Sequence, residues 1–269
     1  MRINFILFTV VLSLLAGCSS VFVSQDSAPR NPPSDLSSIP NAVPKVEPVT
    51  KAGNPGSYVI RGKRYYVKKS SKGFVQRGIA SWYGTKFHGR KTSNGERYDM
   101  YAMTAAHKTL PIPAYVEVTN LRNGRKIIVR VNDRGPFESN RIIDLSYTAA
   151  HKLGILGKGT GLVEIRAIDP HRPKSHRPAT VEAKAPEPTL HKTSLYLQVG
   201  AFSERNNAEE LRSWLETSLA SAVKVDSVNQ KKQSLYRVRV GPIKTVEEID
   251  HLSTQLASLG IKTPRVIID

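Results

Sequence analysis

Residues 116–131 have the sequence VEVTNLRNGRKIIVRV, from which a β architecture is predicted for the first half of the chain. The runs at its two ends are rich in β-branched residues and favour strands, and Asn123-Gly124 between them is a hairpin turn signal. Another alternating run, 162–165, follows a glycine-rich stretch. One short helix is predicted around 146–153. Many short strands separated by glycines are typical of a small closed barrel.

The second half of the chain alternates strand and helix patterns. Residues 195–199 have the period of two that is typical of a strand, and Ser203 can cap a helix with one apolar face. Thr245 and Glu248 form a capping box for a second helix. With further strand patterns at 223–225, 236–240 and 266–268, the order is βαββαβ. This order predicts a ferredoxin-like arrangement, in which an antiparallel sheet is backed by two helices.

Two proline-rich stretches divide the chain. Residues 19–55 lack an apolar period and predict a flexible tether, and a second proline-rich break begins near residue 169. The remaining pieces have ordinary domain lengths. The predicted divisions are a signal peptide at 1–17, a lipidated N-terminus and flexible linker at 18–73, a barrel domain at 74–168, a Pro-rich linker at 169–193 and a C-terminal domain at 194–269.

The N-terminus has the features of an export signal. A charged start, an apolar run at 5–15 and small residues before Cys18 form a secretory signal peptide. The apolar run is too short to span a bilayer. Leu15-Ala16-Gly17-Cys18 resembles a bacterial lipobox, which implies a lipid on Cys18 as the membrane anchor; an ordinary signal with an accidental cysteine is the alternative. Cys18 is the only cysteine, so an intramolecular disulfide is impossible.

The chain is strongly basic, with 40 Lys and Arg against 22 Asp and Glu and a formal charge of +18. Such a balance often indicates a nucleic-acid partner. Export argues against one here, and leaves lipid headgroups, lipopolysaccharide and wall carboxylates as the anionic partners. Many of the basic residues lie in one stretch, 61–77. This stretch is either a binding patch or a solvated linker face.

The candidate chemistry lies in carboxylates. No G-x-S-x-G elbow or zinc-ligand spacing is present, so we expect neither a metal nor another cofactor. Glu96 and Asp133 lie in glycine-bounded turns, and Asp144 lies in a third candidate stretch. Cleavage of a glycoside is carboxylate chemistry, and the rings of Trp82 and Tyr83 can stack on a sugar. Taken alone, the turn at Asp133 favours a plain salt-bridged turn over a catalytic one.

The motifs in these stretches resemble the rare lipoprotein A family. They are GIASWYG at 78–84, FHG at 87–89, TSNGE at 92–96, AAHKTLP at 105–111, VNDRGP at 131–136 and RIIDLS at 141–146. The C-terminal piece resembles the SPOR domain, which binds glycan strands stripped of their stem peptides. The resemblance implies a mainly β protein with a six-stranded double-psi β-barrel, followed by an α+β SPOR domain.

The resemblance also implies an activity, that of an endolytic lytic transglycosylase at the septal ring. Such an enzyme cuts between N-acetylmuramic acid and N-acetylglucosamine in peptide-free strands, leaves 1,6-anhydro ends and acts in cell separation. By motif position, Asp133 is the general acid/base, with a pKa raised by burial or by a neighbour such as Glu96. Glu96 supports charge or positions the sugar, and His107 completes the site by hydrogen bonding.

In the SPOR piece the resemblance places Gln198 and Arg237 at the glycan, with Tyr236 as a further stacking candidate. For the whole chain it implies an outer-membrane anchor facing the periplasm, enrichment at the division septum and contacts with division-site proteins. The alternative is a non-catalytic, expansin-like protein that binds peptidoglycan without cutting it. The appearance of anhydro ends on glycan strands separates the two.

Overall fold

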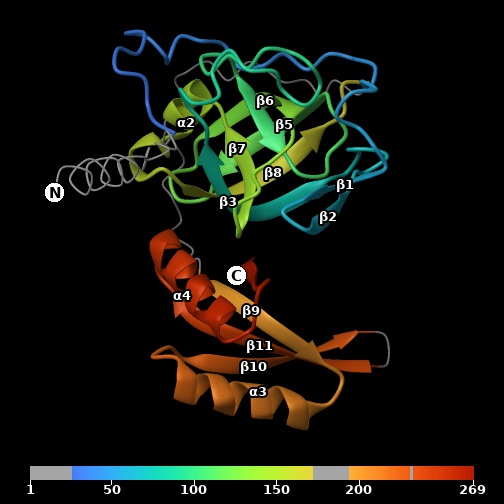
Figure 1. Ribbon diagram of the computed structural model, residues 1–269, viewed down its shortest axis with the longest axis vertical. Coiled ribbons are helices and arrows are strands. Elements are labelled where there is room, and N and C mark those ends of the chain that lie inside the picture. Colours follow the sequence, from blue (N-terminus) through green and yellow to red (C-terminus); the bar gives the residue numbers. More distant parts are fainter. Residues whose placement is uncertain (1–25, 172–193, 231–232) are drawn as a thin grey trace, which may run out of the picture.

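The computed structural model describes residues 26–171, 194–230 and 233–269. The signal peptide at 1–17, the predicted lipidation site Cys18 and residues 172–193 of the Pro-rich linker lie outside this range. The described residues form a β-barrel and, below it in Figure 1, a smaller sheet with two helices.

Six strands close the barrel, in the order β3-β7-β4-β6-β5-β8. The pairs β3–β7 and β4–β6 are parallel, and the other pairs are antiparallel. Alternate residues point inward, so Val116, Val118 and Val129 are fully buried in the barrel core. The predicted six-stranded barrel is confirmed. Its strands are β3 (Val75–Trp82), β4 (Thr104–His107), β5 (Ala114–Asn120), β6 (Lys126–Asp133), β7 (Arg141–Leu145) and β8 (Gly161–Ile168).

The predicted short helix is α2 (Tyr147–Leu153), followed by the 3-10 turn η1 (Leu156–Lys158). The Ser146 hydroxyl accepts a hydrogen bond from the Ala149 N–H at its start. Gly154 ends the helix in the left-handed conformation, with φ of 76°. Within the described part of the chain, no helix has both the length and the apolar character needed to cross a bilayer.

The C-terminal part confirms the predicted βαββαβ order. Its antiparallel sheet has the strand order β10-β11-β9-β12. Thr245 caps the second helix as predicted, since its hydroxyl accepts from the Glu248 N–H at 3.1 Å. The first helix begins one residue later than predicted, with Glu204 in place of Ser203 at the cap. The elements are β9 (Leu195–Phe202), α3 (Arg205–Ser218), β10 (Val223–Gln230), β11 (Gln233–Ile243), α4 (Val246–Ser258) and β12 (Arg265–Ile268).

Residues 26–73 differ from the flexible linker that their composition predicts. Coloured blue in Figure 1, the segment's first part crosses the top of the barrel. Asp26 accepts hydrogen bonds from the Gly84 and Lys86 N–H groups, and Leu36 is only 5% exposed. A side chain at position 84 would collide with the Ser27 carbonyl. The segment lacks an apolar period, but its polar groups pair with the barrel one by one.

The same segment ends in a two-stranded hairpin, β1 (Ser57–Ile60) and β2 (Lys63–Tyr66). Asn54, just before it, accepts from the Ile112 N–H at 2.9 Å and donates to the Ile112 carbonyl at 2.6 Å. The Tyr58 hydroxyl donates to the Lys108 carbonyl at 2.6 Å. These bonds hold the hairpin against the loop that follows β4.

The barrel and the C-terminal part touch, whereas the Pro-rich linker predicts independent domains. Arg141 forms an ion pair with Asp250 on α4 at 2.6 Å, and Asn140 donates to the Ser253 hydroxyl at 2.7 Å. The buried Ile79 of the barrel belongs to the same apolar cluster as the C-terminal core. The contact is therefore part polar and part apolar.

Candidate functional site

Four strands of the barrel place Ser81, Asp144, Ala106 and Asp133 in one row. Asp133 at the end of β6 pairs with Ala106 of β4, which pairs on its other side with Asp144 of β7. Asp144 pairs in turn with Ser81 of β3. Residues in register on adjacent strands point to the same face of a sheet. The two aspartates therefore face the same side, separated by the small side chain of Ala106.

Asp133 is half-buried and its orientation is fixed by three donors. Its Oδ1 accepts from the Ser93 N–H at 2.8 Å, the Ser93 hydroxyl at 2.5 Å and the Arg134 N–H at 2.7 Å. Among the described residues, no hydrogen bond reaches its Oδ2. Hydrogen bonds to one oxygen thus fix the orientation of the carboxylate.

Asp144 is a carboxyl group of the barrel whose pKa is raised above its ordinary value. Burial raises the pKa of Asp144 to about 6, against opposing effects of the Ser81 hydroxyl and of nearby cations. The Ser81 hydroxyl donates to its Oδ1. A side-chain carbon on Gly135 would lie 3.9 Å from Asp144 Oδ2 and 3.8 Å from the Ala106 methyl group. The turn after Asp133 therefore approaches Asp144 closely.

Glu96 lies beside this row and is paired with a cation. Its Oε2 accepts from Arg130 at 2.7 Å and from the Asn132 amide at 2.8 Å, and these donors, Arg130 first, lower the pKa of Glu96. Arg130 also pairs with Glu47 of the N-terminal segment at 2.7 Å. Glu96 is thus an ionised carboxylate, linked to Asp133 through the preceding residue Asn132.

His107 is 2% exposed and holds a loop. Its Nδ1 accepts from the Thr109 N–H at 3.1 Å and the Leu110 N–H at 3.0 Å, so the proton lies on Nε2, 3.4 Å from Gln76 Oε1. Burial, with help from nearby cations, lowers the pKa of His107 to about 3. The imidazole is neutral, and in the described residues it makes no hydrogen bond to Asp133. Its hydrogen bonds fix the loop that follows β4.

Arg134 ties that loop to the N-terminal segment. Its guanidinium donates to the Gly53 carbonyl at 2.8 Å, to Asn54 Oδ1 at 3.0 Å and to the His107 carbonyl at 3.1 Å. The side chain is occupied by these acceptors, and it forms no ion pair with the Asp133 carboxylate.

The aromatic pair predicted to stack on sugar is placed differently from the prediction. Tyr83 is 7% exposed, because its ring stacks on Tyr98 with centroids 4.0 Å apart and meets the edge of Phe87. Trp82 is half-buried and packs edge-on against Tyr147 at 5.7 Å. Both rings support the wall of the site, and Tyr83 has no free face for a sugar in this conformation.

On the C-terminal sheet, Gln198 and Arg237 lie on the face opposite the helices. Gln198 of β9 is the register partner of Arg239 on one side and Arg265 on the other. Tyr236 precedes Arg237 and packs against the apolar cluster on the helix side of the sheet. Tyr236 and Arg237 therefore point to opposite faces, contrary to their predicted shared role.

Tyr196 is the aromatic residue on the face of Gln198. It lies two residues before Gln198 on the same strand, and Lys224 Nζ is 4.0 Å from the centroid of its ring. The strand period of two was sufficient to find it in the sequence. Asp144, by contrast, was recognised as a carboxylate without a role, because its immediate neighbours Ile143 and Leu145 are apolar.

Comparison with known proteins agrees with this geometry. The family model described as lytic transglycolase matches residues 75–165, and the SPOR domain model matches residues 192–265. Three proteins named endolytic peptidoglycan transglycosylase RlpA are similar over most of their length. The one from Pseudomonas aeruginosa (strain UCBPP-PA14) is 41% identical over 85% of this chain and 81% of its own. The one from Vibrio cholerae is 42% identical over 94% and 93%. The one from Neisseria meningitidis serogroup A is 42% identical over 80% and 84%. The chain therefore belongs to the RlpA family of peptidoglycan transglycosylases, as its motifs predict.

Proposed function

We propose that this chain is an endolytic lytic transglycosylase that cuts between N-acetylmuramic acid and N-acetylglucosamine and leaves 1,6-anhydro ends. The observation that supports it best is the placement of Asp133 and Asp144 on either side of Ala106, in a barrel that matches the lytic transglycolase model. The names of the similar proteins agree with this activity.

The first step of the reaction is proton donation. A group with a pKa of about 6 keeps a useful protonated fraction near neutral pH, and Asp144 is such a group. In our proposal Asp144 gives its proton to the glycosidic oxygen. The bond between that oxygen and C1 of the muramic acid then breaks, and the leaving N-acetylglucosamine keeps the proton as a hydroxyl.

The second step closes the anhydro ring. The C6 hydroxyl of the muramic acid attacks C1, and Asp133, oriented by Ser93 and the Arg134 N–H, accepts its proton. No water is consumed, and the two carboxyl groups exchange protons with solvent before the next cycle. The two tasks that the sequence assigns to Asp133 alone are thus divided between Asp133 and Asp144.

Glu96 and His107 act on this pair from a distance in the proposal. The ionised Glu96 stabilises the positive charge that develops on the sugar, as a fixed negative charge does in a preorganised site. The neutral His107 holds the loop whose carbonyls orient Arg134, the residue next to Asp133.

The C-terminal sheet is the binding module of the proposal. Gln198 and Arg237 contact peptide-free glycan on the face opposite the helices, and Tyr196 takes the stacking role predicted for Tyr236. The module gathers the chain at the division septum, and a lipid on Cys18 anchors it to the outer membrane facing the periplasm. Contacts with division-site proteins belong to the same proposal.

The test is mass analysis of purified peptide-free glycan after incubation with the protein. New 1,6-anhydro ends support the transglycosylase, reducing ends indicate a hydrolase, and binding without cleavage indicates the non-catalytic alternative. Asp133→Asn and Asp144→Asn should each abolish detectable product, since general acid–base help is typically worth 10²–10⁴-fold. Glu117→Gln on strand β5, outside the row of Asp133 and Asp144, is the matched control, because this carboxylate pairs only with Lys126 among the described residues.

A further inference from the structure

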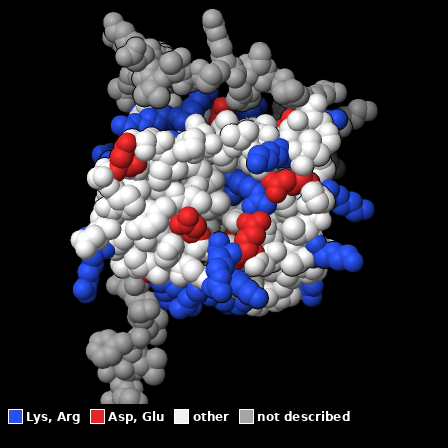
Figure 2. Space-filling view, turned by 90° about the horizontal axis from the view of Figure 1, so that it is seen from above, with Lys and Arg blue, Asp and Glu red and all other residues white. Residues whose placement is uncertain are grey.

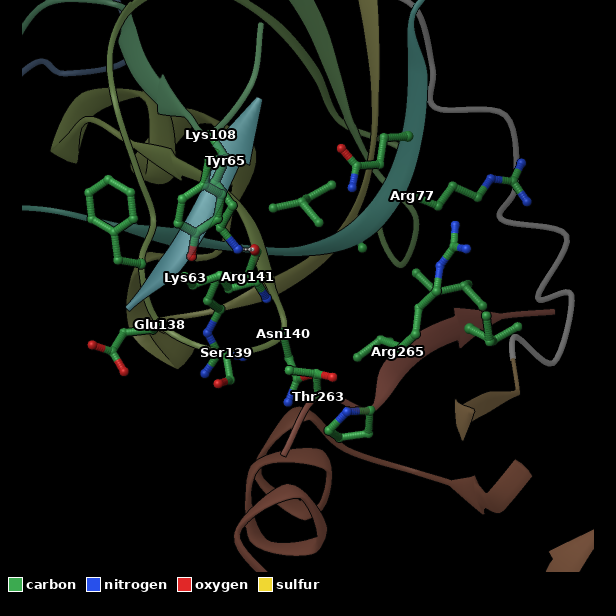
Figure 3. A pocket seen from close by; sticks show the side chains of 18 of the residues that line it. Lys63, Tyr65, Arg77, Lys108, Glu138, Ser139, Asn140, Arg141, Thr263 and Arg265 are labelled. Carbon is green, nitrogen blue, oxygen red and sulfur yellow. Dashed lines mark hydrogen bonds between the residues drawn. The ribbon is translucent and has the colours of Figure 1, made fainter. Parts of the chain in front are cut away.

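A cavity of about 770 Å³ lies where the barrel meets the C-terminal part. Its volume is in the range of ligand pockets. One side comes from the hairpin β1–β2, from β3 and from the turn before β7, and the other comes from residues 262–268. In Figure 3, Lys63, Tyr65 and Lys108 lie across this space from Thr263 and Arg265. We call it the interdomain groove.

The groove is strongly basic. Its lining includes seven cationic side chains and one carboxylate: Arg61, Lys63, Arg77, Lys108, Arg141, Lys262 and Arg265, with Glu138. Ion pairs occupy three of the cations, through Arg61–Glu138, Arg77–Glu164 and Arg141–Asp250. On the barrel face seen in Figure 2, by comparison, basic side chains lie mostly around the rim.

Four cations of the groove have no carboxylate partner among the described residues. One of them, Lys108, is half-buried and donates to the Arg141 carbonyl. Lys63, Lys262 and Arg265 are exposed, and in the described part of the chain none of them forms an ion pair within 4.0 Å. They come from two separate parts of the molecule, β2 and the stretch that ends in β12. Converging unpaired cations of this kind favour an anionic ligand.

The groove also contains aromatic surface. Tyr65 and Phe137 both line it, with ring centroids 5.7 Å apart. Lys63 Nζ lies 5.9 Å from the centroid of the Tyr65 ring, so a cation and an aromatic ring are presented together. A sugar that bears a negative charge matches this pairing, because its apolar ring face can contact the aromatic groups.

The groove lies between the two sites already described. At one end, Lys108 and Arg141 lie close enough to Asp144 for their charges to oppose the rise of its pKa by burial. Lys108 Nζ also donates to the Arg141 carbonyl at 2.6 Å. At the other end, Arg265 is the register partner of Gln198 on the glycan-binding sheet. A ligand that fills the groove would approach both.

We propose that the interdomain groove binds the peptide-free glycan strand between the C-terminal sheet and the catalytic row, by pairing its cations with the carboxylates of the muramic acid residues. Removal of a stem peptide breaks an amide at the lactyl group and leaves a carboxylate there. A stripped strand is therefore a regular polyanion, whereas an intact strand has an amide at each of these positions. The inference rests on the proposed function for its ligand.

Parts of this groove lie outside the two matched family models. The hairpin residues Lys63 and Tyr65 precede the barrel match at 75–165, and residues 266–268 follow the SPOR match at 192–265. Both sides of the groove thus include residues outside the matched regions. In the proposed mechanism, the lactyl group takes no part in bond breaking or ring closure. Recognition of its carboxylate in the groove would therefore add selection of stripped over intact strands.

The experiment compares two ligands on the purified full chain in detergent. One is the peptide-free strand, and the other is the same strand after chemical reduction of its lactyl carboxylates to alcohols. The wild type should bind the first about tenfold more tightly at low salt, and added salt should remove the difference. The double variant Lys63→Gln/Lys262→Gln should bind both strands equally. The control Lys158→Gln/Lys244→Gln removes two exposed lysines outside the groove and should keep the preference.

Three results would overturn the inference. The first is equal binding of both strands by the wild type, and the second is an unchanged preference in the groove variant. The third is a groove variant that loses binding to anionic phospholipid vesicles but keeps wild-type binding to the peptide-free strand. Thermal melting of each variant excludes unfolding as the cause. End analysis of the wild-type digest is a separate readout. If the groove variant loses the preference but the wild type makes no anhydro ends, the catalytic proposal is contradicted and the proposal that the groove binds the carboxylates is supported.

Discussion

Asp133 and Asp144 are register partners of the same residue, Ala106, and approach it from opposite sides. Adjacent strands lie ~4.8 Å apart, so the two Cα atoms are separated by roughly 10 Å. This separation places the two carboxyl groups on different strands. It also gives them different surroundings, since three donors hold Asp133 and burial dominates at Asp144.

Asp144→Asn should be inactive and more heat-stable than the wild type at pH 8. The folded-state pKa of about 6 lies above the ordinary 3.8, so the folded protein binds the extra proton between these values. Stability therefore falls as pH rises from 4 to 6, and above pH 6 the buried charge costs up to about 3 kcal/mol. Melting curves from pH 4 to 8 measure this.

The same residue predicts the alkaline limb of the rate profile. In the proposed mechanism Asp144 must be protonated to act, so the wild-type rate should fall about tenfold per pH unit above pH 6. A profile that stays flat from pH 6 to 8, or an Asp144→Asn variant with normal turnover, would assign the acid to another group.

His107→Asn should destabilise the protein at pH 7 by about 1–3 kcal/mol, since it disturbs the acceptor of two buried backbone N–H groups. The pKa of about 3 lies below the ordinary 6.5, so the unfolded chain binds the extra proton between these values. The contribution of His107 to the free energy of unfolding of the wild type should therefore decrease as the pH drops below 6.5. The variant should lack this part of the acid sensitivity. An identical dependence of melting temperature on pH in the wild type and the variant would refute this prediction.

Glu96→Gln and Glu47→Gln form a matched pair, because both carboxylates bind Arg130. Each should change the free energy of unfolding by less than about 1 kcal/mol, as partly exposed ion pairs do. Only Glu96 also bonds the Asn132 amide next to Asp133, so Glu96→Gln should lower turnover at least about tenfold and Glu47→Gln should not. Equal losses in both variants would indicate a structural role through Arg130.

Tyr196→Ala and Tyr236→Ala should separate binding from stability. Tyr196 lies on the face of Gln198, so its loss should weaken binding of peptide-free glycan with little change in melting temperature. Tyr236 packs against the apolar core on the other face, and its loss should lower the free energy of unfolding by about 2–4 kcal/mol. Calorimetry and strand binding on the full chain check both; reversed effects would return the stacking role to Tyr236.

The local elements of this fold were predictable because their signals are local. The signals for the Asn123-Gly124 turn, the short helix around 146–153 and the Thr245–Glu248 box each act within a few residues of chain, and all three elements lie where the sequence places them. The row that joins Asp133 to Asp144 was not predictable from spacing. It depends on the parallel pair β4–β6, whose register is set by packing between distant segments.

The N-terminal segment was misjudged for a related reason. Prolines and serines with no apolar period indicate a tether, because periodicity reports only a continuous buried face. Asp26, Leu36 and Asn54 instead fix the segment at separate points, and each partner is far away in the sequence. Single contacts of this kind leave no pattern.

The bond of Asp26 to the Gly84 and Lys86 N–H groups limits how far the barrel can be from a membrane. Asp26 is eight positions after Cys18 in the sequence, and a fully extended chain spans at most about 3.6 Å per position. If Cys18 carries the proposed lipid, Asp26 therefore lies within about 29 Å of the bilayer surface. Under that proposal, glycan is cut on the membrane-proximal side of the wall.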